Sequence, residues 1–138
     1  MDYIDSFCIG EFGDEFIFQE SGIRGYLSYT IYVYGGERDI PHFHVIKPAD
    51  NFECCVCIYE PKYFDHEGKT SMLNSKERKI LNEFLKATSK INRGFSNWQA
   101  IEFLWNYANL KKGETPKQST KSQQPDYTKM VDSIHKYK

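Results

Sequence analysis

The sequence contains no long apolar run. None of its segments approaches the roughly 20 consecutive apolar residues that a transmembrane helix requires. Residues 1–5 also lack the basic region followed by an apolar one that a secretory signal would show. These two absences predict a cytoplasmic protein with no membrane partner.

The spacing of the cysteines is unsuited to disulfides. The four cysteines are Cys8, Cys54, Cys55 and Cys57, so three of them fall within four positions. A small secreted fold is stapled by cysteine pairs spread along the chain, which this spacing does not provide. The cysteines therefore favour a reducing, cytoplasmic environment as well.

Positive charge is scarce in the first 110 residues, which hold 11 Lys and Arg against 16 Asp and Glu. Residues 111–138 have the opposite balance, with 7 basic residues against 3 acidic ones. A surface that follows a phosphate backbone needs an excess of basic residues. RNA is therefore disfavoured as a partner of the first 110 residues, and we expect a protein partner or a second copy of the chain instead.

Aromatic and β-branched residues alternate with polar ones in the first sixty residues. The chain has 138 residues, 40% of them hydrophobic, which suits one domain with a substantial core. The clearest strand is residues 27–34, which two glycines end. Further strands are expected at about residues 6–12, 15–19, 42–47 and 52–59. Because the connections are short, this pattern predicts an antiparallel meander of about five strands.

The hydrophobic period changes from 2 to 3.6 in the following segment. Asn74 and Glu77 resemble a capping box ahead of a helix over residues 75–89. Ser96 begins a second amphipathic helix over residues 97–110. We expect both helices to pack on one face of the sheet, which gives an α+β domain over residues 1–110.

The last 28 residues divide into two parts. Residues 111–125 are almost entirely polar and predict a linker. Residues 126–138 carry apolar side chains at helical spacing, which predicts a short amphipathic helix capped by Asp126. We expect this helix to dock on its own domain or on a neighbouring chain.

His42 and His44 stand at i, i+2 in an expected strand, so both imidazoles point to one face. A four-residue loop after Lys47 would pair His44 with Cys55 and His42 with Cys57. Two imidazoles and two thiols form a ligand set that zinc favours. The alternatives are that no cofactor is bound and the histidines hold the strand through hydrogen bonds, or that His42 and His44 are catalytic.

An aromatic strand at residues 31–34, an acidic turn and a Pro-His-Phe-His strand at residues 41–44 resemble a family of small bacterial proteins of unknown function. The resemblance extends over residues 22–110 and implies helices after the sheet, the last of them bearing a tryptophan. It also implies association with protein or RNA, because members often occur in gene pairs arranged like toxin and antitoxin. The cysteine-rich strand and the basic tail are not part of the family's pattern.

Two functions follow from these observations. The first is a protein-interaction module, in a toxin–antitoxin-like or defence-related setting that the resemblance implies. Its expected binding residues are two sheet tyrosines and two apolar residues of the tail, namely Tyr32, Tyr34, Met130 and Ile134. The alternative is a small metal-dependent hydrolase or nuclease that uses His42 and His44.

Overall fold

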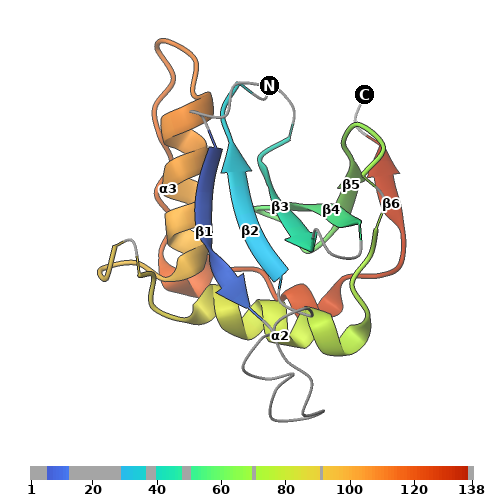
Figure 1. Cartoon of the computed structure of the whole chain (residues 1–138). Coiled ribbons are helices and arrows are strands. Elements are labelled where there is room, and N and C mark those ends of the chain that lie inside the picture. Colours follow the sequence, from blue (N-terminus) through green and yellow to red (C-terminus); the bar gives the residue numbers. More distant parts are fainter. Residues whose placement is uncertain are drawn as a thin grey trace.

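Six strands form one sheet in the order of the sequence, as the computed structural model shows (Figure 1). The structure describes residues 6–12, 29–36, 40–47, 51–69, 71–90 and 92–136, with backbone alone for 6–12 and 134–136. Strands β1 to β5 pair antiparallel with their neighbours, whereas β6 pairs parallel with β5. The strands are β1 (Ser6–Phe12), β2 (Tyr29–Tyr34), β3 (His42–Lys47), β4 (Phe52–Cys57), β5 (Tyr63–Asp65) and β6 (Ile134–Lys136).

The register of the β3–β4 hairpin decides which side chains share a face. Lys47 pairs with Phe52, His44 with Cys55 and His42 with Cys57. Asn51, the residue before β4, has a φ of 53°, a left-handed conformation that asparagine tolerates in tight turns. The predicted register is therefore confirmed, and both histidines share a face with Cys55 and Cys57.

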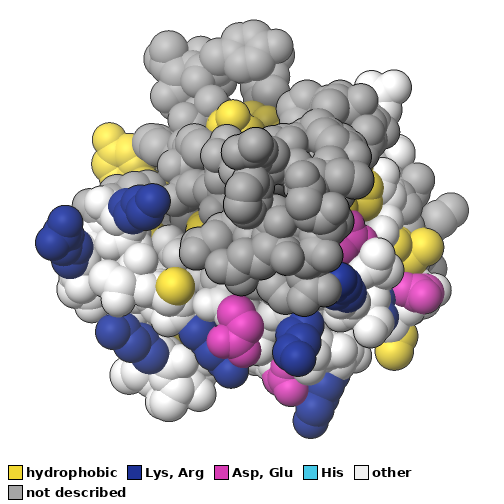
Figure 2. Space-filling view, turned by 60° about the horizontal axis from the view of Figure 1, so that its bottom comes forward, with side chains coloured by type: hydrophobic (Ala, Val, Ile, Leu, Met, Phe, Trp, Pro, Cys, Tyr) yellow, Lys and Arg dark blue, Asp and Glu magenta, His cyan; other side chains and the backbone are white. Residues whose placement is uncertain are grey.

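Two helices follow, α2 (Ser75–Lys86) and α3 (Asn97–Asn109). Both begin with a complete capping box, in which Asn74 pairs with Glu77 and Ser96 pairs with Gln99. Each box satisfies two backbone N–H groups that the first helical turn would leave without a partner. Helix α2 runs beneath the strands in Figure 1. Figure 2 turns this lower side of the molecule forward and shows several Lys and Arg side chains on it.

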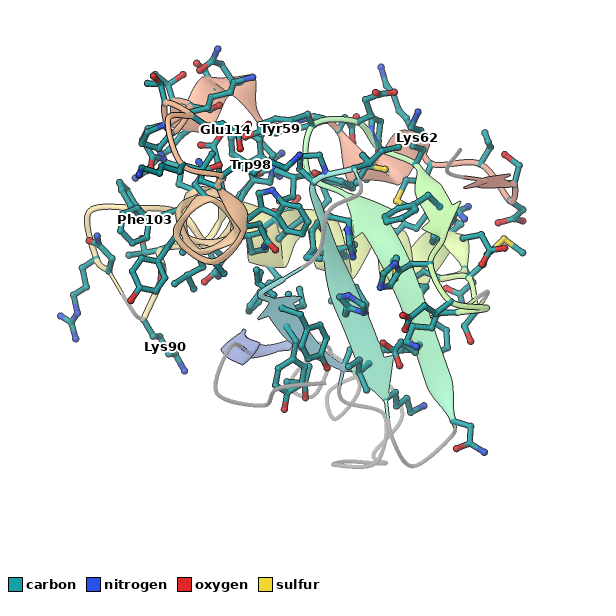
Figure 3. All side chains as sticks on the ribbon, turned by 90° about the horizontal axis from the view of Figure 1, so that it is seen from above. Tyr59, Lys62, Lys90, Trp98, Phe103 and Glu114 are labelled. Atoms are coloured by element: carbon teal, nitrogen blue, oxygen red, sulfur yellow. The ribbon has the colours of Figure 1, made fainter. Side chains whose placement is uncertain are left out.

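The main core joins the sheet and the two helices. Alternate residues of the central strands, among them Ile31, Phe43 and Val56, form one buried cluster with Leu85 of α2 and Trp98 of α3. Figure 3 shows Trp98 on the side of α3 that faces the sheet. A second, smaller cluster contains Cys55, Cys57 and Phe64. Both faces of the central strands are therefore buried.

The α+β class predicted from the sequence is confirmed, with differences in detail. The described residues form six strands, of which β5 and β6 were not predicted. The strand expected at residues 15–19 lies outside the described residues. Helix α2 ends at Lys86, three residues earlier than predicted, because the chain turns to form an isolated bridge between Thr88 and Ser96.

The C-terminal helix predicted over residues 126–138 is absent from its described part, residues 126–136. A single 3-10 turn, Tyr127–Lys129, begins at the Asp126 cap, and residues 134–136 then add β6 to the edge of β5. Tyr127 and Met130 are buried in the main core, whereas Val131 is 64% exposed. An isolated helix of this length is marginal in water, and pairing with a sheet edge satisfies the backbone instead.

Residues 111–125 were predicted to be a polar linker, and they contain no strand or α-helix. They nevertheless lie against α3. Glu102, a fully buried carboxylate, accepts hydrogen bonds from the Ser119 amide at 2.6 Å and from the Ser119 hydroxyl at 2.7 Å. Gln99 and Asn106 of α3 donate to the Ser119 and Lys117 carbonyls. This segment has almost no apolar side chains to bury, and hydrogen bonds attach it to α3 instead.

Among the residues that the structure describes, no helix has the length and apolar content required to cross a membrane.

Candidate metal centre

His42 and His44 lie side by side on β3, and their exposed fractions are 0% and 2%. The strand alternation sends Phe43 to the main core and both imidazoles to the opposite face. Burial of two imidazoles is costly unless their nitrogens have partners. The contacts of the four ring nitrogens therefore decide what the pair can do.

Hydrogen-bond partners fix the tautomer of both rings. Nδ1 of His42 lies 2.7 Å from the carbonyl oxygen of Ile40, and Nδ1 of His44 lies 2.9 Å from Oε2 of Glu53. A carbonyl and a carboxylate oxygen accept hydrogen bonds and do not donate them, so each Nδ1 carries a proton. In the neutral rings, the lone pair therefore resides on Nε2.

The two Nε2 atoms face each other at 3.1 Å. Two nitrogen lone pairs repel at this distance, so a proton or a metal ion has to lie between them. Nitrogens that bind one tetrahedral zinc ion at about 2.0–2.1 Å lie about 3.3–3.4 Å apart. The observed separation is close to this value, and the geometry suits a shared ion.

Cys55 supplies a third ligand atom. One nitrogen from each of His42 and His44 and the sulfur of Cys55 all lie within 4.8 Å of one another. The sulfur lies beside the His44 ring, 3.6 Å from Nδ1, the nitrogen that faces Glu53 and not the one assigned to the ion. Cys57, the fourth residue of the predicted set, is not in this group, because Nε2 of His42 is directed along the strand toward His44. The structure thus brings three of the four predicted ligands together.

Glu53 orients the His44 ring. Its side chain is 27% exposed, and it lies on the same face of β4 as Cys55, two residues away. A carboxylate that binds the Nδ1 proton of a histidine is the usual outer-shell partner of a zinc-bound imidazole, since it fixes the ring and raises its basicity. The alternation of β4 predicts the shared face, but not the contact with His44.

Aromatic rings enclose the centre. The ring of His42 lies 4.5 Å from that of Phe64 and 5.1 Å from that of Trp105, measured between centroids. The ring of Tyr34 meets His44 edge-on at 4.5 Å. An apolar shell of this kind excludes water and strengthens the bond between a cation and its ligands.

Burial keeps the thiols of Cys54 and Cys57, which lie outside the centre, in their unreactive protonated form. Burial raises the pKa of the Cys57 thiol to about 12. Burial, with the nearby charge of Glu53, also raises the pKa of Cys54 well above its ordinary value. Neither sulfur is a thiolate near neutral pH, so neither is a nucleophile there.

The four residues predicted to bind a partner differ in how far they are buried. Tyr32 and Tyr34 are half-buried on β2 and stack with centroids 6.0 Å apart. Met130 is 3% exposed and belongs to the main core, so it is not available to a partner in this conformation. Ile134 begins β6, where the structure describes only the backbone.

Comparison of the chain with protein-family models, with curated proteins and with solved structures finds no match.

Proposed function

We propose that this chain is a small metal-binding protein that holds a zinc-type divalent ion through Nε2 of His42, Nε2 of His44 and the sulfur of Cys55. One observation carries the proposal: the two Nε2 atoms face each other at 3.1 Å while both Nδ1 atoms are committed as donors. Imidazole and thiolate are the ligands that zinc prefers.

The burial of the ligands supports a structural role for the ion over a catalytic one. His42, His44 and Cys55 are at most 2% exposed. A catalytic zinc keeps an open position that the substrate can reach, whereas a structural zinc is enclosed by its ligands. A hydrolase or nuclease that uses His42 and His44 as catalytic groups is therefore less favoured than a protein with a structural metal ion.

The direct test is the metal content of protein purified without added metal. We expect stoichiometric zinc by elemental analysis, and we expect Co²⁺ to give the intense visible absorption of a tetrahedral site with a thiolate ligand. Protein that contains no metal and gives no spectral change with Co²⁺ or Zn²⁺ would contradict the proposal.

Cys55 and Cys57 provide a matched pair for this test. Both are buried in the same small cluster on one face of β4, so replacing either with alanine removes a similar sulfur from a similar environment. Only Cys55 belongs to the ligand group. We expect Cys55→Ala to lose the metal and Cys57→Ala to retain it; equal retention would exclude the sulfur of Cys55 as a ligand.

We also propose a protein-interaction role, which the exposed side of α3 supports. Phe103 and Tyr107, one helical turn apart, are 50% and 74% exposed. Figure 3 shows Phe103 on the side of α3 opposite Trp98. Replacing both exposed residues with serine should reduce any self-association seen by analytical ultracentrifugation without altering metal content. The toxin–antitoxin-like setting rests on the resemblance of residues 31–34 and 41–44 alone.

A further inference from the structure

A third imidazole lies at the metal centre. The ring centroids of His42 and His44 are 4.9 Å apart, those of His42 and His66 are 4.9 Å apart, and those of His44 and His66 are 5.5 Å apart. The three rings therefore form a nearly equilateral triangle. His66 is not among the ligands predicted from the sequence, because no strand alternation connects it to β3.

Three imidazoles on one tetrahedral ion would form nearly the same triangle. A zinc–nitrogen bond of about 2.05 Å and a ring radius of about 1.1 Å place each centroid about 3.2 Å from the ion. Two such centroids at the tetrahedral angle are about 5.2 Å apart. The three observed distances lie on both sides of this value and within about 0.3 Å of it.

The backbone fixes the position of His66. It pairs with Lys69 across a two-residue turn in which Glu67 and Gly68 have φ values of 54° and 78°. Two successive positive φ values are typical of the tight turns that close hairpins. Asp65 strengthens the turn by accepting a hydrogen bond from the Gly68 amide at 3.1 Å. The ring is therefore held beside the centre by a tight, hydrogen-bonded turn.

We propose that His66 is the third imidazole ligand, so that His42, His44, His66 and Cys55 form a closed tetrahedral zinc site. The nitrogens of His66 are not in the group of ligand atoms within 4.8 Å of one another, so its ring has to turn when the ion binds. The histidine χ2 torsion has broad minima, and the side chain is only half-buried. This inference rests on the proposed function and assigns the site to the structural class, with no position open to substrate.

X-ray absorption spectroscopy of the zinc-loaded protein tests the ligand set directly. We expect scattering from three imidazoles and one sulfur in the wild-type protein, and from two imidazoles and one sulfur in His66→Phe. Phenylalanine keeps an aromatic ring beside His42 and Phe64, and thermal unfolding of the metal-free variant checks that the fold is retained.

Zinc affinity, measured by competition with a chromophoric chelator, gives a second measure. Loss of a partner that orients a ligand costs roughly 10- to 100-fold in metal affinity, so Glu53→Gln should bind zinc more weakly by a factor in this range. His66→Phe loses a ligand itself, and its zinc affinity should fall by more than Glu53→Gln. Lys69→Ala, in the same turn, should leave the affinity unchanged. Wild-type protein that binds zinc with two imidazoles, or an unchanged affinity in His66→Phe, would overturn this inference and leave the proposed function standing. Wild-type protein that binds no zinc would overturn both.

Discussion

Trp98 and Tyr127 meet at a single backbone carbonyl. The indole Nε1 of Trp98 donates to the Ile58 carbonyl at 2.9 Å, and the Tyr127 hydroxyl donates to the same oxygen at 2.6 Å. Ile58 directly follows β4, Trp98 belongs to α3, and Tyr127 belongs to the C-terminal tail, residues 111–138. Three segments that are distant in the sequence therefore converge here. The tail is thus an integral part of the core.

Substitutions in the tail should reveal this role. Tyr127 is fully buried, so Tyr127→Ala should lower the free energy of unfolding by about 3–5 kcal/mol, as other large-to-small core changes do. Tyr127→Phe removes only the hydroxyl and should cost about 0.5–1.5 kcal/mol. Urea denaturation followed by tryptophan fluorescence measures both changes.

Val131 is the matched control for the tail. It lies on the apolar stripe of the predicted helix, but it is 64% exposed in the structure. Val131→Ala should therefore change the free energy of unfolding by no more than about 0.5 kcal/mol. A loss as large as that of Tyr127→Ala would mean that the helix predicted over residues 126–138 forms after all.

The carboxylate of Glu102 offers a test of how residues 111–125 are held. Its oxygens accept hydrogen bonds from the Ser119 amide, the Ser119 hydroxyl and, at 2.7 Å, the Tyr59 hydroxyl. Glu102→Gln replaces one acceptor oxygen with an NH₂ group that faces donors, which should cost about 1–3 kcal/mol of stability. Lys121→Ala, at an exposed position of the same segment, should cost less than about 0.5 kcal/mol. Equal unfolding midpoints for the two variants would exclude this role.

Sequence patterns predicted those elements that contacts between neighbouring residues determine. The capping boxes at Asn74 and Ser96 locate both helix starts, and the loop after Lys47 sets the register that brings His44 opposite Cys55. The tail could not be predicted in this way. Its apolar spacing suits a helix, but the partners that decide its conformation, such as Asn82, which accepts a hydrogen bond from the Tyr127 amide, are far away in the sequence.

The position of His66 depends on the same kind of distant contact. Strand β5 has three residues, too few to show an alternating pattern, and its pairing with β4 is what brings His66 toward the β3 histidines. The candidate ligands His42, His44 and Cys55 follow from strand alternation and register. The two rings are oriented with their Nε2 atoms toward each other because their Nδ1 atoms contact Ile40 and Glu53. These two contacts could not be predicted from the sequence.

The thiol of Cys57 should be unreactive in the folded protein. Its pKa is raised by burial to about 12, so only about one molecule in ten thousand carries the thiolate at pH 8. We expect iodoacetamide to label Cys57 only after unfolding in urea, as measured by mass spectrometry of the peptide that contains it. Labelling of the native protein at the rate of a free cysteine would mean that β4 opens readily.

Zinc should stabilise the fold through the centre on β3 and β4. A ligand that binds only the folded state adds about 2.7 kcal/mol at a free concentration one hundred times its Kd. We expect a urea midpoint that rises with zinc concentration for the wild-type protein and for Cys57→Ala. The midpoint of Cys55→Ala should rise only at much higher zinc concentrations, because a ligand of the ion is lost. Magnesium, which prefers oxygen ligands, should have no effect on any of the three proteins. A midpoint that zinc raises equally in Cys55→Ala and Cys57→Ala would place the ion elsewhere and contradict the assigned ligands.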